Sequence, residues 1–116
     1  MLAAPRIAAC VFSLAEAVEI HRKVEEDLLY PAILRAFGED FPPMRVMEAE
    51  HGEIQRYVSG LRERAADVPA LARGLVDVLR QHIEKEIQVL FPMAESRIPT
   101  ADLEAMQTRA AAMRGA

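Results

Sequence analysis

Apolar residues recur every three or four positions along most of this chain, which is the spacing of one face of an α-helix. The pattern is clearest between residues 44 and 61, and similar stripes run through residues 14–32 and 71–93. In the clearest stripe the inward positions are Met44, Met47, His51, Ile54, Val58 and Leu61. The pattern predicts amphipathic helices around a shared interior, and therefore an all-α protein.

Residues typical of helix ends divide the chain. Ser13 and Glu16 form a capping-box pattern, in which each side chain satisfies a free amide at a helix start. Gly38 tolerates the backbone conformation that ends a helix, and Asp67 with Pro69 suits the start of another. Asp40 before two prolines and Thr100 after Pro99 mark the other two starts. The expected helices span residues 13–37, 41–66, 68–97 and 100–114.

The connections between these helices are short, so neighbouring helices should run antiparallel, as in an up-down bundle. A chain of 116 residues is long enough for one hydrophobic core and too short for two. The sequence therefore predicts a single domain over residues 1–116, with three long helices and a short C-terminal helix.

Composition and charge exclude several classes of protein. The net charge is −4 and no basic cluster occurs, which argues against binding to nucleic acid. No apolar run reaches the roughly 20 residues that span a membrane, and the N-terminus makes a poor signal peptide. The single cysteine, Cys10, cannot form an internal disulfide. We expect a soluble cytoplasmic protein.

All three histidines of the chain lie on inward stripes, one in each long helix. His21 and His82 each have a glutamate four residues later on the same face, at Glu25 and Glu86. One such pair alone could be a surface ion pair worth a few tenths of a kcal/mol. A buried ionised carboxylate, however, is costly unless a cation compensates it. Two inward pairs therefore favour a metal site.

The two pairs belong to an internal repeat. The segment HRKVEEDLLYP, which starts at His21, aligns with HIEKEIQVLFP, which starts at His82, at an offset of 82 − 21 = 61 residues. A surface ion pair gives no reason for the aromatic–proline ending to recur. Pro31 and Pro92 each remove a mid-helix amide and should kink their helices near the same end of the site.

These repeats, with Glu50–His51 between them, resemble the hemerythrin-like (HHE) cation-binding domains over residues 13–97. The resemblance implies an up-down four-helix bundle that holds a di-iron centre. Carried over by position, the histidines would be terminal ligands and the glutamates would bridge the metals. The implied metal ligands are His21, Glu25, His51, His82 and Glu86. Ligands of these types suit iron or manganese, and zinc is compatible with them.

The chain departs from that family in its first helix, which usually supplies a histidine. His51 precedes His82 by 31 residues, and a partner 31 residues before His21 would precede the chain. The chain could be a shortened form, the site could be a reduced one, or a second copy could fill the open groove. A missing helix exposes apolar stripes, so we expect a homodimer. The helix expected at 100–114 could cover part of the groove.

Two further departures argue against reversible oxygen transport. Gln55 stands where the oxygen carriers have a histidine, and Glu86 stands one residue before the position of their aspartate. The resemblance instead favours a non-haem iron protein that binds or senses dioxygen or nitric oxide, or takes part in iron handling. A di-iron oxidase or peroxidase would use the same ligands, so enzyme activity stays open. The alternative from a different class is a metal-free helical interaction module with a vestigial site.

Five neighbouring residues are expected to have structural roles. Tyr30 and Phe91 are expected to pack in the core, although either could line a small-ligand pocket. Arg22 and Glu26 have the spacing of a solvated helix pair. Glu50 is expected on the surface, beside the inward His51.

Overall fold

The computed structural model of the protein describes residues 4–63 and 67–115, and side chains from residue 13 onward. Four helical segments account for nearly all of these residues. The first segment consists of α1 (Ala4–Val24), η1 (Glu25–Leu29) and α2 (Tyr30–Phe37), and the second is α3 (Pro42–Arg62). The third consists of α4 (Val68–Lys85), η2 (Glu86–Leu90) and α5 (Phe91–Arg97), and the fourth is α6 (Thr100–Met113). The elements η1 and η2 are single π-helical turns within continuous helices.

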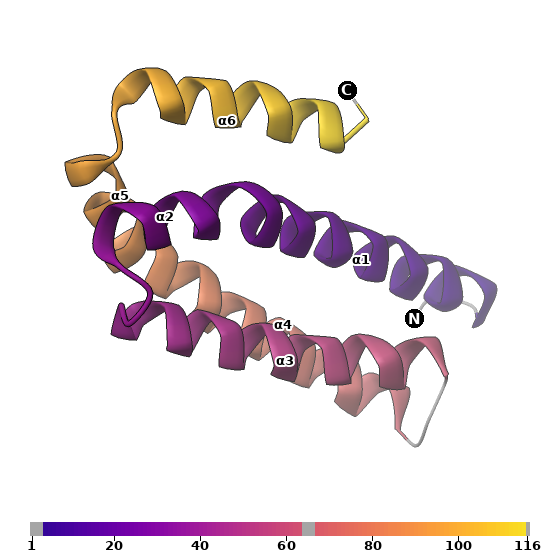
Figure 1. The fold of residues 1–116 in the computed structure, drawn as a ribbon. Coiled ribbons are helices and arrows are strands. Elements are labelled where there is room, and N and C mark those ends of the chain that lie inside the picture. Colours follow the sequence, from indigo (N-terminus) through magenta and orange to yellow (C-terminus); the bar gives the residue numbers. More distant parts are fainter. Residues whose placement is uncertain (1–3, 64–66, 116) are drawn as a thin grey trace.

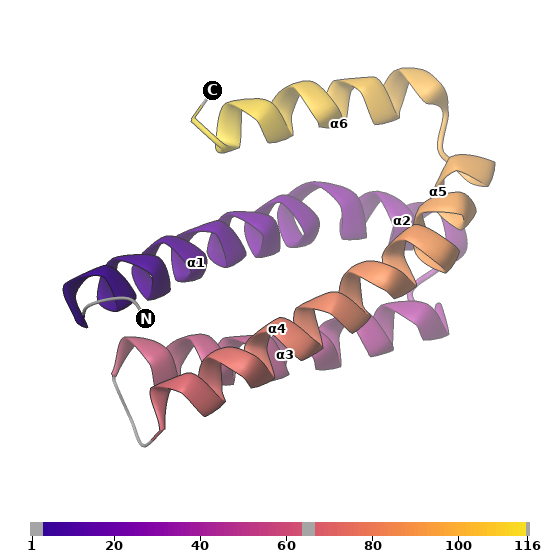
Figure 2. The same ribbon diagram turned by 180° about the vertical axis from the view of Figure 1, so that it is seen from behind.

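The helices form an up-down bundle, in which successive segments run in opposite directions (Figure 1). Helix α3 packs against both α1 and α4, and the short α6 returns along α1 and η1. Seen from behind, α4 and α5 continue to the end of the bundle from which α6 departs (Figure 2). The described residues contain no strand. The predicted all-α helical bundle is confirmed.

The observed helix ends correct several predicted boundaries. The first helix begins at Ala4, so Ser13 lies in mid-helix and caps nothing. Pro5 is tolerated in a first turn, and the alanines that follow favour the helix. At α3 and α6 the N-cap residues are Phe41 and Pro99, in place of Asp40 and Thr100. The second helix ends at Arg62; residues 64–66, like the side chain of Cys10, lie outside the described part of the chain.

Two predicted helix ends are confirmed. The carboxylate of Asp67 accepts a hydrogen bond from the backbone N–H of Ala70 at 3.2 Å, which satisfies one free amide at the start of α4. Gly38 has a φ of 97°, a backbone conformation that side chains with a Cβ rarely adopt, and it directly follows α2. These two residues set where the first helical segment ends and the third begins.

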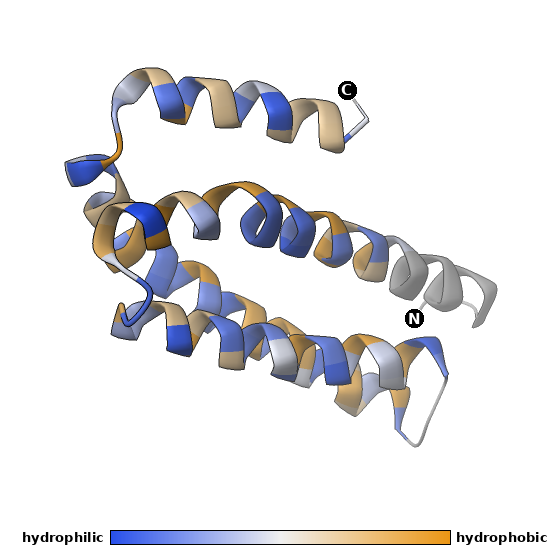
Figure 3. Ribbon diagram, viewed as in Figure 1, coloured by the Kyte–Doolittle hydropathy of each residue, from blue (hydrophilic) through white to orange (hydrophobic). Residues whose placement is uncertain are grey.

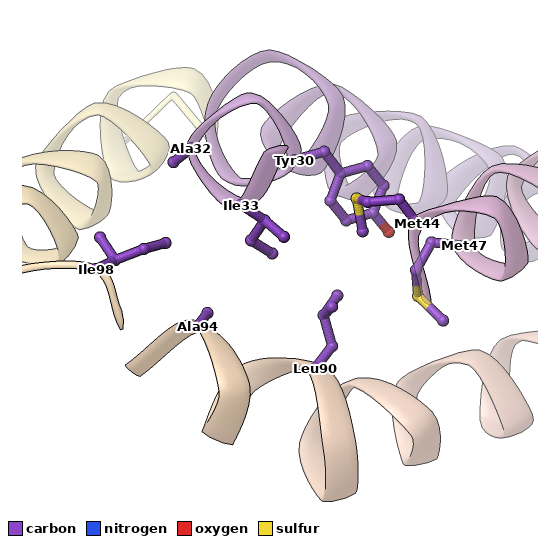
Figure 4. Packing of buried hydrophobic residues seen from close by; sticks show 8 residues of the cluster. All are labelled: Tyr30, Ala32, Ile33, Met44, Met47, Leu90, Ala94 and Ile98. Atoms are coloured by element: carbon purple, nitrogen blue, oxygen red, sulfur yellow. The ribbon is translucent and has the colours of Figure 1, made fainter. Parts of the chain in front are cut away.

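In the coloured part of the ribbon, hydrophobic and hydrophilic residues alternate along the helices (Figure 3). The buried apolar residues form two clusters. The first, at the end formed by α2 and α5, is shown in Figure 4 and contains Tyr30, Ala32, Ile33, Met44, Met47, Leu90, Ala94 and Ile98. The second, toward the opposite end, contains Ala15, Val18, Ile54, Val58, Leu61 and Leu75. Along each long helix, the inward histidine lies between the residues of these clusters.

Helix α4 and η2 also carry exposed apolar side chains. Val76, Ile83 and Ile87 are each at least 42% exposed, and together with Leu79 they line a shallow groove. The second copy that we expected to cover such a surface stays a prediction. None of the described helices combines the length and hydrophobicity required to span a membrane.

Truncation of Leu75 tests the second core cluster. Leu75 is 0% exposed, so Leu75→Ala should leave a cavity and lower the free energy of unfolding by about 2–5 kcal/mol. Val76→Ala, at the exposed neighbouring position, should change it by about 0.5 kcal/mol or less. Urea unfolding of the metal-free variants, followed by circular dichroism, measures both. Equal effects of the two substitutions would contradict this assignment of the core.

Candidate metal centre

The sequence repeat corresponds to a structural repeat in the backbone. Glu25 and Glu86 are each the first residue of a π-helical turn. In the first turn the backbone N–H of Tyr30 donates to the carbonyl of Glu25, and in the second the backbone N–H of Phe91 donates to the carbonyl of Glu86. The prolines at which we predicted kinks follow directly, at positions 31 and 92. A π turn inserts one extra residue and is frequent at functional sites. The two glutamates thus occupy equivalent positions in their helices.

All five side chains proposed from the sequence come together between the two core clusters. Glu25, His51, His82 and Glu86 are no more than 5% exposed, and the His21 side chain is 37% exposed. One oxygen, Oε1 of Glu25, lies 2.8 Å from Nε2 of His21 and 3.0 Å from Nε2 of both His51 and His82. Each long helical segment therefore contributes a histidine to one point in the interior.

Glu86 closes the group from the third helical segment. Its Oε1 lies 3.4 Å from Nε2 of His82 and 3.6 Å from Nε2 of His21. The four side chains of His21, Glu25, His82 and Glu86 each offer a ligand atom within 4.8 Å of the other three. The Nε2 atom of His51 joins them, because it lies 3.2 Å from Nε2 of His82.

With neutral imidazole rings, some of these atoms are left without a hydrogen-bond partner. Nδ1 of His82 lies 2.9 Å from the Glu50 carboxylate, which can only accept a hydrogen bond. In a neutral His82 ring the proton is therefore on Nδ1, and Nε2, which faces Glu25 and His51, carries none. Oε2 of Glu25 is buried and has no hydrogen-bond partner. Buried polar atoms without partners are costly. A cation bound among these nitrogen and oxygen atoms would satisfy them, so the residues present fit a metal ion.

The charge of Glu25 also favours a bound metal ion. Burial by itself raises the pKa of Glu25, but hydrogen bonds from His21, His51 and His82 outweigh that effect and hold it below its usual value. Glu25 is therefore ionised at neutral pH, although it is 3% exposed. A buried anion surrounded by three imidazole nitrogens is a favourable place for a cation.

Glu50 was predicted to lie on the surface, and that prediction was wrong. Its Oε1 accepts the hydrogen bond from Nδ1 of His82, and its other oxygen pairs with Lys85. Adjacent helix positions differ by about 100°, so Glu50 lies on the flank of α3, where α4 packs against it. The contact orients the His82 ring and turns its Nε2 toward the site. Only the packing of α3 on α4 reveals this role.

Tyr30 has a role that we predicted only in part. Its ring packs in the first core cluster, as expected. Its hydroxyl group, however, reaches the five-residue site and lies 3.1 Å from both Oε1 of Glu25 and Nε2 of His51. Phe91, the equivalent residue of the second repeat, is half-buried and has no hydroxyl group.

A polar network flanks the site on α1. Arg22 donates to Glu26 at 2.5 Å, so this predicted pair is confirmed, and it also pairs with Glu19. The hydrogen bond from Arg22 lowers the pKa of Glu19 to about 2. The side-chain amide of Gln55 donates to Glu19 at 3.2 Å. Gln55 is thus engaged outside the histidine–glutamate group.

The Glu50 contact generates a prediction about metal affinity. In Glu50→Gln the side chain loses the charge that orients His82, and loss of such a partner typically weakens metal binding by about 10–100-fold. Glu48→Gln, an exposed position on the same helix, should leave the affinity unchanged. Anaerobic titration with iron(II) against a competing chelator measures both variants. Unchanged affinity in Glu50→Gln would contradict the orienting role.

Comparison with known proteins agrees with this geometry. The family model described as the hemerythrin HHE cation binding domain matches residues 3–94. The iron-sulfur cluster repair protein YtfE of Escherichia coli O1:K1 / APEC is 32% identical over 95 residues, covering 70% of this chain and 43% of that protein. Its counterpart in Salmonella paratyphi B is 31% identical over 96 residues, covering 71% of this chain and 44% of that protein.

The chain thus spans less than half the length of these curated relatives. No solved structure matched it. The family match covers most of the chain, including the three histidines and two glutamates that gather between its core clusters. The chain belongs to the hemerythrin HHE cation-binding domain family.

Proposed function

We propose that this protein binds non-haem iron and takes part in iron handling. The metal ligands in this proposal are His21, Glu25, His51, His82 and Glu86. The observation that carries it is the convergence of three imidazole Nε2 atoms within 3.0 Å of one buried carboxylate oxygen. A cation bound among these atoms would satisfy them together.

The types of ligand support iron. The site offers three imidazole nitrogens and two carboxylates, a mixture that suits iron or manganese, and its residues include no thiolate, which softer metals favour. Iron bound there would supply redox chemistry and positions for small ligands. The chain's own contribution is to hold the donors in place and to surround them with two apolar clusters.

The named relatives support the cellular role. Both are iron-sulfur cluster repair proteins, and this chain matches less than half of each. Iron handling is the part of that role that a metal-binding domain of this size would itself perform. The activity of a whole repair protein would require residues that this alignment does not cover.

The exposure of the site at His21 supports a second part of the proposal, which is that the protein binds a small diatomic molecule. His21 is 37% exposed, whereas the four other ligands are buried. A small cavity beside it is lined by Val18, His21, Arg22, His51, Ile54, Gln55 and Leu79. A molecule the size of dioxygen or nitric oxide would reach the iron past His21.

Removal of His82 tests the iron site. His82→Ala deletes a fully buried donor and should reduce bound iron to background, as should treatment of the native protein with a strong chelator. Gln81→Ala, an exposed neighbour, should keep the native iron content. Elemental analysis after anaerobic loading and desalting measures all three samples. An iron content of native level in His82→Ala would refute the proposed ligand set.

Addition of nitric oxide tests the diatomic element. The iron(II)-loaded protein should form an iron–nitrosyl species, visible by absorption and electron paramagnetic resonance, because its solvent-facing side admits the gas. Zinc-loaded protein is the control and should show no such signal. Iron-loaded protein whose spectra do not change would refute diatomic binding and leave the iron-binding proposal standing.

A further inference from the structure

We propose that Tyr30 is a direct metal ligand, its hydroxyl oxygen supplying a sixth donor beside the three histidines and two glutamates. This inference rests on the proposed iron-binding function. It concerns the aromatic position of the repeat, where the first copy has a hydroxyl group and the second has phenylalanine, at position 91.

The position of the hydroxyl oxygen is the primary observation. It lies 3.1 Å from Oε1 of Glu25, 3.1 Å from Nε2 of His51 and 3.3 Å from Oε2 of Glu86. The contacts that link the five proposed ligands fall in the same range, from 2.8 to 3.6 Å. Two donors bound at right angles to one ion, each about 2.1 Å from it, are separated by about 3.0 Å. By distance, Tyr30 occupies a ligand position.

Core packing does not account for the hydroxyl group. The Tyr30 ring packs in the first cluster, and Phe91 occupies the same place in the second repeat without a hydroxyl group. A buried hydroxyl group must find partners, and those of Tyr30 come from all three long helical segments through Glu25, His51 and Glu86. Every one of those partners is a proposed metal ligand.

The chemistry of phenol fits an iron site. Without metal, burial and the nearby Glu25 raise the pKa of Tyr30, so its hydroxyl group keeps its proton and donates to the carboxylates. On binding of iron(III), the O–H bond breaks, the oxygen lone pair forms the bond to iron and the proton leaves to solvent. Phenolate is a hard oxygen donor, which suits a trivalent ion. Tyr30 would therefore favour iron(III) over iron(II).

The test uses the visible absorption of iron(III) bound to phenolate. The chain has two tyrosines, Tyr30 and Tyr57. Tyr57 lies on α3 with its ring against Gly74 of α4, and it packs on the second core cluster. Iron(III)-loaded native protein should show a phenolate-to-iron charge-transfer band, with matching phenolate modes in resonance Raman spectra. The band should survive in Tyr57→Phe.

In Tyr30→Phe the band should disappear, and iron(III) affinity should fall by at least the roughly 10–100-fold typical of losing a supporting contact. If that variant does not fold, a band retained in Tyr57→Phe still assigns the phenolate to Tyr30. The ligand role is refuted if iron-loaded native protein has no phenolate band, or if the band persists in Tyr30→Phe. Failure of the native protein to bind iron at all would instead refute the proposed function.

Discussion

The structure depends on a buried negative charge, the carboxylate of Glu25, which three helices surround with imidazole rings. An ionised carboxylate in an apolar interior costs several kcal/mol unless other groups compensate it. Here His21, His51 and His82 approach a single oxygen of Glu25, and the second buried carboxylate, Glu86, lies beside them. The helices that carry these side chains must pack closely enough to keep the group together.

Two apolar clusters supply that packing, one on each side of the polar group. Ile33 and Leu90 are among the buried residues of the first, and Leu75 and Val58 among those of the second. Burial of such side chains contributes about 1.5–3 kcal/mol each, which offsets the cost of the charges between them. The π turns at Glu25 and Glu86 then place both carboxylates at corresponding points of the first and third helical segments, which run in the same direction (Figure 1).

The two repeats are equivalent in backbone but differ in chemistry. His82 is completely buried and oriented by Glu50, whereas His21 is partly exposed. Tyr30 brings a hydroxyl group into the site, and Phe91 does not. The centre therefore has a rigid, enclosed side and a more accessible side.

Several features follow from local sequence alone. The helical period identified the all-α class and the inward faces, because a residue's face depends only on its position within the helix. The repeat brought His21, Glu25, His82 and Glu86 together as a group, and the periodicity of α3 added His51. Local helix-end patterns were less informative: Asp67 was identified as a cap, but Ser13 lies in mid-helix because residues 4–12 also form helix.

Other features required the tertiary structure. The sequence placed Glu50 beside an inward residue, but only the packing of α4 on α3 brings Nδ1 of His82 within 2.9 Å of it. The Tyr30 ring is an ordinary core side chain by pattern, yet its hydroxyl group contacts Glu25, His51 and Glu86, which come from three helical segments. Periodicity specifies which face of a helix a residue occupies. The distance and rotation between helices, which determine what that face meets, depend on the packing of the whole bundle.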